Sequence, residues 1–230
     1  MIARGQGVHG ELALRQRGDD PAVYELIVNG VFVMDSVETS TERLLAEEFL
    51  ARHAAPRHVL VGGLGLGYTA AALLDDSRVE HVDIVEIEPL LVDWLRRGLV
   101  RGARDVLRDP RVHVEIGDVV DVLATMPAGR YDGILLDVDN GPGFLVHDNN
   151  ASVYESSALA AAGEALREGG VLAVWSAAPA EKLRLDLEAA VGSCDVVTAD
   201  VVRDGRAMTY YLYLASPADQ TPRRWLCSSL

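Results

Sequence analysis

A glycine-rich loop between two short apolar runs constrains the fold of this chain more than any other feature. The loop follows the run Val59–Val61, and a helical stretch and a second apolar run, Val82–Ile87, come after it. Glycine lets the backbone turn tightly and lets a ligand approach the main chain where the following helix begins. The segment from Val59 to Glu88 is therefore predicted to form a strand, a ligand-binding loop, a helix and a second strand. The glycines of the loop are Gly62, Gly63, Gly65 and Gly67.

Tyr68 decides which kind of glycine loop this is. A P-loop that binds nucleoside triphosphates needs lysine at this position, and the dinucleotide-binding pattern GxGxxG needs glycine or alanine there. Tyrosine fits neither pattern. The spacing that remains, GxGxG, resembles the loop of methyltransferase-like Rossmann domains. We therefore expect the loop to bind the adenosine part of an S-adenosylmethionine-type donor.

Two acidic positions farther along the chain support a nucleoside site. Glu86 stands at the end of the next predicted strand, about 20 residues beyond the loop, where an acid accepts hydrogen bonds from ribose hydroxyls. Glu88 takes this role if the strand ends later, and a solvated strand end is the other interpretation of Glu86. Asp118 follows the predicted strand Val112–Ile116. We expect it to bind the adenine amino group, to cap the next helix, or to do both.

Short apolar runs alternate with helical stretches from Arg57 onward, as expected of strands buried on both faces of a parallel sheet. The last two runs flank Asp204-Gly205, which is typical of a hairpin turn. The pattern predicts an α/β fold, with a Rossmann-like, doubly wound, mostly parallel sheet that an antiparallel hairpin closes. The predicted strands are Val59–Val61, Val82–Ile87, Val112–Ile116, Gly133–Asp137, Val171–Ser176, Val196–Val202 and Met208–Leu214, and the predicted helices are Thr69–Leu74, Pro89–Leu99, Val119–Met126, Ser156–Leu166 and Glu181–Val191.

The first residues of the chain predict a small antiparallel β-hairpin module. Val23–Val28 and Val31–Met34 flank Asn29-Gly30, the strongest short signal for a tight hairpin turn. The run Glu11–Arg17 alternates polar and apolar residues and is expected to be a strand of the same sheet.

A helix is expected to follow this module, from about Ser40 to His53, with Thr39 and Glu42 as a capping box. The chain then divides into three predicted parts. Residues 1–55 form the β module with its helix, residues 56–216 form the donor-binding domain, and residues 217–230 form a C-terminal tail.

Composition limits the classes of partner. The formal net charge of −14 argues against nucleic acid as a partner, because phosphate neutralisation needs a basic face. An acidic surface would attract a cationic substrate, and the other interpretation is that the charge only keeps the protein soluble. Without a membrane-spanning run or a signal pattern, we expect a cytoplasmic protein that does not bind membranes. The two cysteines and six histidines are scattered, so no disulfide and no metal site are predicted.

Two more carboxylates, Asp137 and Asp139, follow the fourth strand of the predicted sheet. With the motifs above, they make the chain resemble the spermidine synthase (polyamine aminopropyltransferase) family over roughly residues 11 to 215. The segments that carry the resemblance are Val59–Gly67, Val82–Glu88, Gly117-Asp118 and Tyr131–Asp137 with Gly141-Pro142 after it.

The resemblance implies a transferase in which a small-molecule amine attacks the alkyl carbon of a sulfonium donor. The co-substrate would be decarboxylated S-adenosylmethionine or S-adenosylmethionine itself, without a metal. Asp137 would be the catalytic acid or base, and Asp139 would bind the amine and assist it. Glu86 and Asp118 would bind the donor's ribose and adenine. A homodimer is also a family-based expectation.

Further residues are candidates for contacts with the amine. Glu42 matches the glutamate of a family segment that closes over the polyamine. His147 lies in the long loop after the aspartates, and Tyr154 follows it, where loops cover the acceptor. A hydrogen-bonded turn with Tyr154 packed inward is the other interpretation. Trp175, at the end of the fifth strand, is expected to fill the core rather than to wall the pocket.

Three departures from the family pattern leave the reaction open. Gly65 stands where the family has an aspartate that binds the donor's ammonium group, Asp139 is displaced, and only Glu42 remains of the closing segment. The first hypothesis is aminopropyl transfer to a polyamine or a related amine. The second is a methyltransferase on a spermidine-synthase-like scaffold, and the third is a non-catalytic protein that binds an adenosine ligand.

Overall fold

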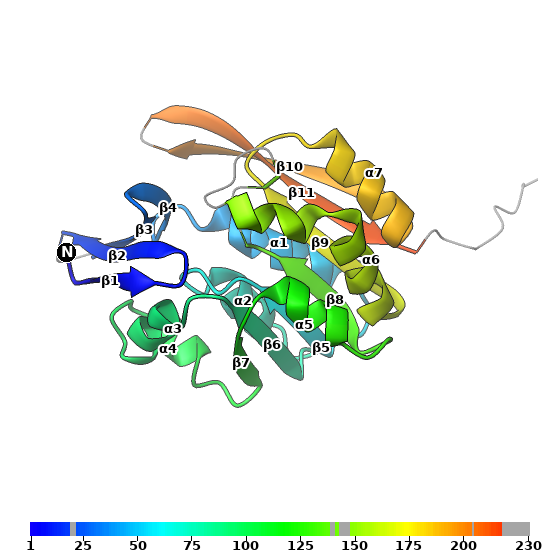
Figure 1. Ribbon diagram of the computed structural model, residues 1–230, viewed down its shortest axis with the longest axis horizontal. Coiled ribbons are helices and arrows are strands. Elements are labelled where there is room, and N and C mark those ends of the chain that lie inside the picture. The colour runs from blue at the N-terminus through cyan, green and yellow to red at the C-terminus, as the bar shows by residue number, and fades with distance from the viewer. Residues whose placement is uncertain (19–21, 139–140, 143–147, 204, 218–230) are drawn as a thin grey trace, which may run out of the picture.

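The chain forms two β-sheets and a set of helices around the larger sheet (Figure 1). The computed structural model describes residues 1–18, 22–138, 141–142, 148–203 and 205–217. Within these residues, no helix is long and apolar enough to cross a membrane. The predicted α/β class is confirmed, with a mostly parallel central sheet and a separate antiparallel sheet before it.

The central sheet has seven strands in the order β10-β11-β9-β8-β5-β6-β7. The chain runs from β5 outward to β6 and β7, and then returns to β8 on the other side of β5. This reversal leaves a crevice at the carboxyl ends of β5 and β8, where ligands bind in doubly wound sheets. The parallel strands are β5 (His58–Gly62), β6 (His81–Glu86), β7 (Val112–Ile116), β8 (Tyr131–Leu136) and β9 (Leu166–Ser176), and the antiparallel hairpin is β10 (Ser193–Arg203) with β11 (Arg206–Ser216).

Successive residues of the central strands point to opposite faces, so the sheet carries two apolar cores. Val59 and Val61 of β5 belong to the core beneath the first group of helices, whereas Leu60 belongs to the core on the other face. The first group is α1 (Ser40–Arg52), α2 (Tyr68–Leu74), α3 (Pro89–Arg96) and α4 (Ala103–Val106), and the second is α5 (Val119–Thr125), α6 (Ser156–Ala165) and α7 (Glu181–Ala190).

The N-terminal sheet consists of β1 (Ala3–Gly7), β2 (Gly10–Arg17), β3 (Val23–Val28) and β4 (Val31–Asp35), paired in chain order. Asn29 and Gly30 have φ values of 50° and 78°, as a tight primed turn requires, so the predicted hairpin is confirmed. Strand β1 was not predicted, because its sequence, ARGQG, has no apolar alternation. It forms by pairing with β2, and in Figure 1 it lies beside α3.

Helix α1 begins at Ser40 as predicted, but the capping box is wrong. Thr39 makes no side-chain hydrogen bond to the helix, and the Glu42 carboxylate accepts a hydrogen bond from the Thr41 hydroxyl instead, at 2.8 Å. Glu42 is buried, because α1 packs against the central sheet and this side chain points inward. The division of the chain after residues 55 and 216 stays a prediction.

Gly133 is expected to be essential for the contact between α1 and β8. A Cβ atom at this position would lie 2.3 Å from the ring of Phe49, so Gly133→Ala should lower the free energy of unfolding by about 1–3 kcal/mol, measured by urea denaturation. Gly117→Ala is the control, because a Cβ atom there meets its nearest neighbour, Val122, at 3.8 Å. Equal stability of the two variants would contradict this packing.

Candidate functional site

A pocket of about 1120 Å³, its open mouth included, lies at the carboxyl ends of the central strands. The N-terminal sheet supplies part of its wall. Among the described lining residues there are five carboxyl side chains and no lysine or arginine, which favours a ligand that carries positive charge. The acidic lining residues are Glu42, Glu86, Glu88, Asp118 and Asp137.

The glycine loop forms the floor of this pocket at two of its four predicted positions. Gly63 and Gly65 line the pocket with φ values of 90° and 51°. A Cβ atom on Gly63 would lie 2.2 Å from the carbonyl oxygen of Asp137, so only glycine fits. Gly62 and Gly67 support the loop from outside the pocket: a Cβ atom on Gly62 would lie 3.0 Å from the side chain of Leu136, and Gly67, with φ 90°, is the N-cap of α2.

Glu86 fastens the glycine loop to the end of β6. Its Oε2 accepts a hydrogen bond from the backbone N–H of Leu64, and its Oε1 accepts one from the backbone N–H of Glu88, both at 2.8 Å. Burial raises the pKa of the Glu86 carboxyl, although these two hydrogen bonds favour the ionised form. Each carboxylate oxygen has a second lone pair, so the predicted contact with ribose hydroxyls is compatible with this role.

Glu88 has a different task from the one proposed for it as an alternative to Glu86. Its carboxylate accepts hydrogen bonds from the backbone N–H groups of Val8 and His9, at 2.8 Å and 2.9 Å. These two residues form the turn between β1 and β2. Glu88 therefore anchors the N-terminal sheet over the pocket.

Asp118 serves as the N-cap of α5, which was one of its two predicted roles. Its Oδ1 accepts a hydrogen bond from the backbone N–H of Val120 at 2.9 Å. The residue is half-buried and also lines the pocket, so one carboxylate oxygen faces a helix end while the side chain borders the ligand space. The contact with adenine stays a prediction.

Glu42 and Asp137 bring two carboxyl groups together in the pocket from α1 and the end of β8. The Thr69 hydroxyl donates to Asp137 Oδ2 at 2.7 Å and also lies 3.3 Å from the carbonyl oxygen of Glu42. Thr69, which the sequence analysis did not single out, thus connects the two segments. A cationic amine between the two carboxyl groups would be stabilised by both of them.

The surroundings of this pair disfavour two full negative charges. Burial, and next the charge of Asp137, raise the pKa of Glu42 to about 7. Burial also raises the pKa of Asp137, against the effect of its hydrogen bond from Thr69. Near neutral pH the pair is therefore able both to accept and to donate a proton, as acid–base catalysis needs.

Met34 and Trp175 are lining residues that the sequence did not reveal as such. A Cβ atom on Gly65 would lie 2.8 Å from Met34 Sδ, so the methionine occupies the space where a side chain at position 65 would extend. Trp175 belongs to the core, as predicted, but it also borders the pocket. Its ring lies tilted against that of Tyr210, with the ring centroids 5.1 Å apart, and its indole nitrogen has no hydrogen-bond partner among the described residues.

Of three further predicted substrate contacts, Tyr154 is described, and it packs away from the pocket. Tyr154, at the end of the short 3-10 helix η1 (Asp148–Tyr154), is buried in the core on the α5–α7 side, and its neighbour Val153 lines the pocket instead. The inward packing that competed with substrate binding is thus the observed one. Asp139 and His147 lie outside the described residues.

The raised pKa of Glu42 predicts a pH-dependent stability. A carboxyl whose pKa is higher in the folded state stabilises that state below its ordinary pKa of 4.5, and this contribution is lost as the pH rises through about 7. Relative to Glu42→Gln, the native chain should lose on the order of 2–3 kcal/mol of unfolding free energy between pH 4.5 and pH 8. Urea denaturation across this range measures the loss.

Glu47→Gln is the matched control, because Glu47 lies on the same helix but is exposed. Its stability should follow that of the native chain at every pH. Parallel curves for the native chain and Glu42→Gln would contradict the assignment of a buried, perturbed carboxyl to this position.

Comparisons with known proteins agree with this geometry. Spermine synthase of Arabidopsis thaliana is 31% identical over 158 residues, which cover 65% of this chain and 42% of that protein. Putrescine N-methyltransferase 4 of Nicotiana tabacum is 34% identical over 119 residues, which cover 51% of this chain and 29% of that protein. The chain thus spans less than half the length of these relatives.

The fold is also that of a solved spermidine synthase. A crystal structure of spermidine synthase in complex with the transition-state analogue AdoDATO superposes with a TM-score of 0.80 at 20% identity, covering 94% of this chain and 73% of that one. The family model described as the spermine/spermidine synthase domain matches residues 38–202, most of the chain. On this match, the chain belongs to the spermine/spermidine synthase family.

Proposed function

We propose that this protein is a transferase that alkylates a small amine, with a sulfonium donor of the S-adenosylmethionine type, and that aminopropyl transfer to a polyamine is its first candidate reaction. The observation that carries the proposal is the Glu42–Asp137 carboxyl pair beside the glycine loop, in an acidic pocket. The spermidine and spermine synthases among its relatives support it.

The donor fits the residues of the pocket. Gly63 and Gly65 have no side chain to cover the backbone of the loop, so a nucleoside could approach the main chain closely. Glu86 would accept hydrogen bonds from the ribose hydroxyls while it holds Leu64, and Asp118, which lines the same pocket, would contact adenine. Methylene groups of the donor would contact apolar residues such as Met34 on the N-terminal sheet.

The two carboxyl groups of the pair have different tasks in the transfer. The donor supplies an electrophilic carbon next to a positively charged sulfur. Asp137 orients the amine and accepts its proton as the nitrogen lone pair forms the new C–N bond, while the C–S bond breaks and its electrons stay on sulfur. Glu42 stabilises the positive charge of the bound amine. The pocket aligns the reacting atoms, which contributes much of the rate.

Methyl transfer from intact S-adenosylmethionine is the second candidate, and the pair Gly65 and Met34 favours it. The family's aspartate at position 65 is replaced by glycine, and a thioether fills the space. Without that carboxylate, nothing at this position repels the carboxylate of the intact donor. The putrescine N-methyltransferases among the relatives support this candidate.

The choice between the candidates is tested by binding and product analysis. Isothermal titration calorimetry with intact and decarboxylated donor identifies the one that binds, and mass spectrometry after incubation with putrescine identifies the transferred group. A mass gain of one aminopropyl group supports the first candidate and a gain of one methyl group the second. Failure of both donors to bind overturns the proposal, and binding without turnover over a panel of amines indicates a non-catalytic protein.

Restoring a carboxylate at position 65 should create a preference for the decarboxylated donor. In Met34→Ala/Gly65→Asp the truncation makes room for the new side chain, and aspartate tolerates the positive φ better than most residues. Repulsion of ~1–4 kcal/mol at contact distance predicts a shift of about fivefold to several hundredfold in the ratio of the two dissociation constants. Met34→Ala alone is the control, and an unchanged ratio in the double variant would refute the role of this position.

Asp137→Asn is expected to lower kcat by about 10²- to 10⁴-fold, because the amine loses its proton acceptor. Donor affinity should change little, since Asp137 faces the acceptor. Asp121→Asn, an exposed carboxyl on α5, is the control and should leave kcat unchanged. Single-turnover kinetics with saturating donor measure both, and native turnover by Asp137→Asn would eliminate the catalytic role.

A further inference from the structure

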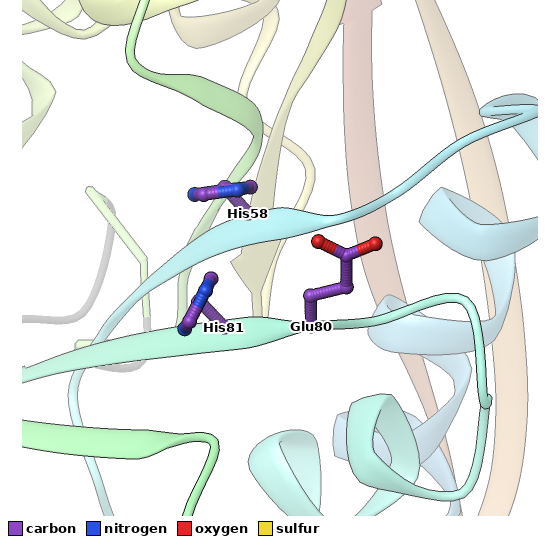
Figure 2. Close-up of side chains that lie close together, drawn as sticks. All are labelled: His58, Glu80 and His81. Carbon is purple, nitrogen blue, oxygen red and sulfur yellow. The ribbon is translucent and has the colours of Figure 1, made fainter.

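A second cluster of chemically active side chains, drawn in Figure 2, lies at the amino ends of β5 and β6, whereas the pocket lies at the carboxyl ends of the strands. His58 is the first residue of β5 and His81 is the first residue of β6, and the two pair directly in the parallel register. Glu80 precedes His81 and points toward the same space. One ligand atom from each of the three side chains lies within 4.8 Å of the other two.

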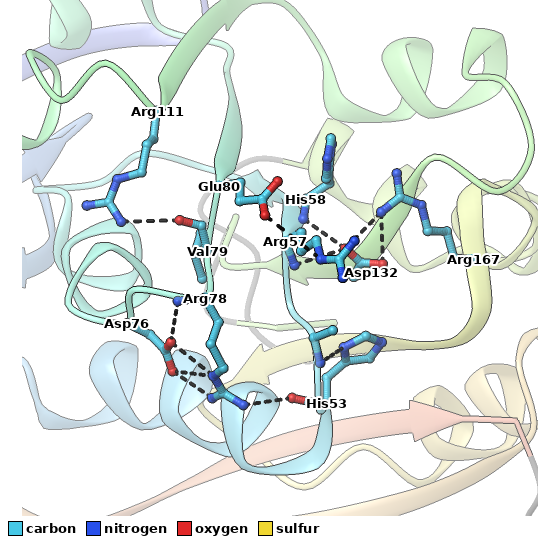
Figure 3. Close-up of polar contacts among 11 residues, drawn as sticks. His53, Arg57, His58, Asp76, Arg78, Val79, Glu80, Arg111, Asp132 and Arg167 are labelled. Atoms are coloured by element: carbon cyan, nitrogen blue, oxygen red, sulfur yellow. Dashed lines mark hydrogen bonds and ion pairs between the residues drawn. The ribbon is translucent and has the colours of Figure 1, made fainter.

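Hydrogen bonds to the Asp132 carboxylate and between the two strands fix the backbone at the cluster (Figure 3). The Asp132 carboxylate accepts hydrogen bonds from the backbone N–H groups of Arg57 and His58, at 3.0 Å and 2.9 Å, and pairs with Arg167 at 2.9 Å. The carbonyl oxygen of Arg57 accepts hydrogen bonds from the backbone N–H groups of both Glu80 and His81. The three Cα positions are therefore set before any ligand binds.

The side chains of the cluster have few interactions that metal binding would break. Within the described residues, no hydrogen bond ties either imidazole ring, and the ring centroids are 4.7 Å apart. Among the described residues, Glu80 forms one ion pair, with Arg57 at 3.9 Å, and both side chains are more than half exposed. An exposed pair at this distance contributes almost nothing to stability, so Glu80 is free to turn toward the rings.

We propose that His58, Glu80 and His81 form a surface binding site for a divalent transition metal ion, with Zn²⁺ as the fitting example. Two imidazole nitrogens and one carboxylate oxygen form a ligand set that zinc accepts, with the fourth position left to water. Metal–ligand bonds of about 2.0–2.2 Å place neighbouring ligand atoms roughly 3.3 Å apart in a tetrahedron. The observed separations need to shrink by about 1.5 Å at most, which side-chain rotation provides at an open surface.

The ion would join β5 and β6 at their amino ends, and it takes no part in the transfer. The carboxyl ends of the same strands carry the glycine loop and Glu86. Four residue steps along β5 separate His58 from Gly62, a length of about 13 Å. The site is thus outside the pocket, and its effect is on the folded state, because a ligand that binds only the folded chain raises its stability.

Zinc titration of the full chain, stripped of metal with a chelator, tests the site. Calorimetry should give one ion per chain, and thermal unfolding should shift to higher temperature when Zn²⁺ is added. His81→Ala removes an exposed ligand on which no described hydrogen bond depends, and it should weaken zinc binding at least tenfold and abolish the shift. Glu80→Gln, which removes the charged ligand and keeps the shape, should weaken binding as well.

His113→Ala is the matched control, because His113 is an exposed histidine on the adjacent strand β7 and stands outside the cluster. Its zinc affinity should equal that of the native chain. No zinc binding by the native chain, or equal affinity of the native chain and His81→Ala, would overturn the proposal. The visible spectrum of bound Co²⁺ gives a second measure that does not depend on heat or on turnover.

Discussion

The two hydrogen bonds that Glu86 accepts hold together the parts on which the pocket depends. One comes from Leu64 in the glycine loop and the other from Glu88 after β6, so a single carboxylate ties the loop to the neighbouring strand end. Glu88 then accepts from the turn between β1 and β2. A short chain of two glutamates thus connects the loop, the central sheet and the N-terminal sheet. The pocket lies between these three parts.

The arrangement explains why the pocket is acidic although no single segment of the chain is. The five carboxyl groups come from α1 and from the ends of β6, β7 and β8, and each accepts a hydrogen bond from the chain as well as lining the pocket. In the Glu42–Asp137 pair, burial and mutual repulsion oppose the ionisation of both carboxyl groups at once. A cationic amine relieves that repulsion. The proposed chemistry therefore uses the two carboxyl groups whose ionised forms the fold disfavours.

The residues proposed for the donor carry local signals in the sequence, whereas part of the lining beside Glu42 and Asp137 carries none. Gly63, Gly65, Glu86 and Asp118 lie at or just after the ends of strands, and the carboxyl ends of parallel strands meet at one edge of a sheet. Met34 and Thr69 carry no such signal. Met34 reads as an ordinary apolar strand residue, and only the docking of the N-terminal sheet places its sulfur beside Gly65. For Glu42, local spacing predicted a helix cap that the structure does not form, and only the family resemblance predicted the position beside the pocket that it occupies.

The proposed metal site could not be predicted from local sequence patterns either. His58 lies far from Glu80-His81 along the chain, so no ligand spacing is visible, and only the register of β5 against β6 brings them together.

The sequence by itself determined the order of strands and helices, the glycine loop and its acid partner, because these depend on periodicity and on backbone conformation over a few residues. The tertiary structure alone decided which side chains face one another across the pocket and across the sheet edge. Those contacts join segments that are far apart in the sequence, and no local pattern predicts how such segments pack. The conformation of the glycine loop follows from its own residues, whereas the chemistry beside it depends on residues that only the fold brings near.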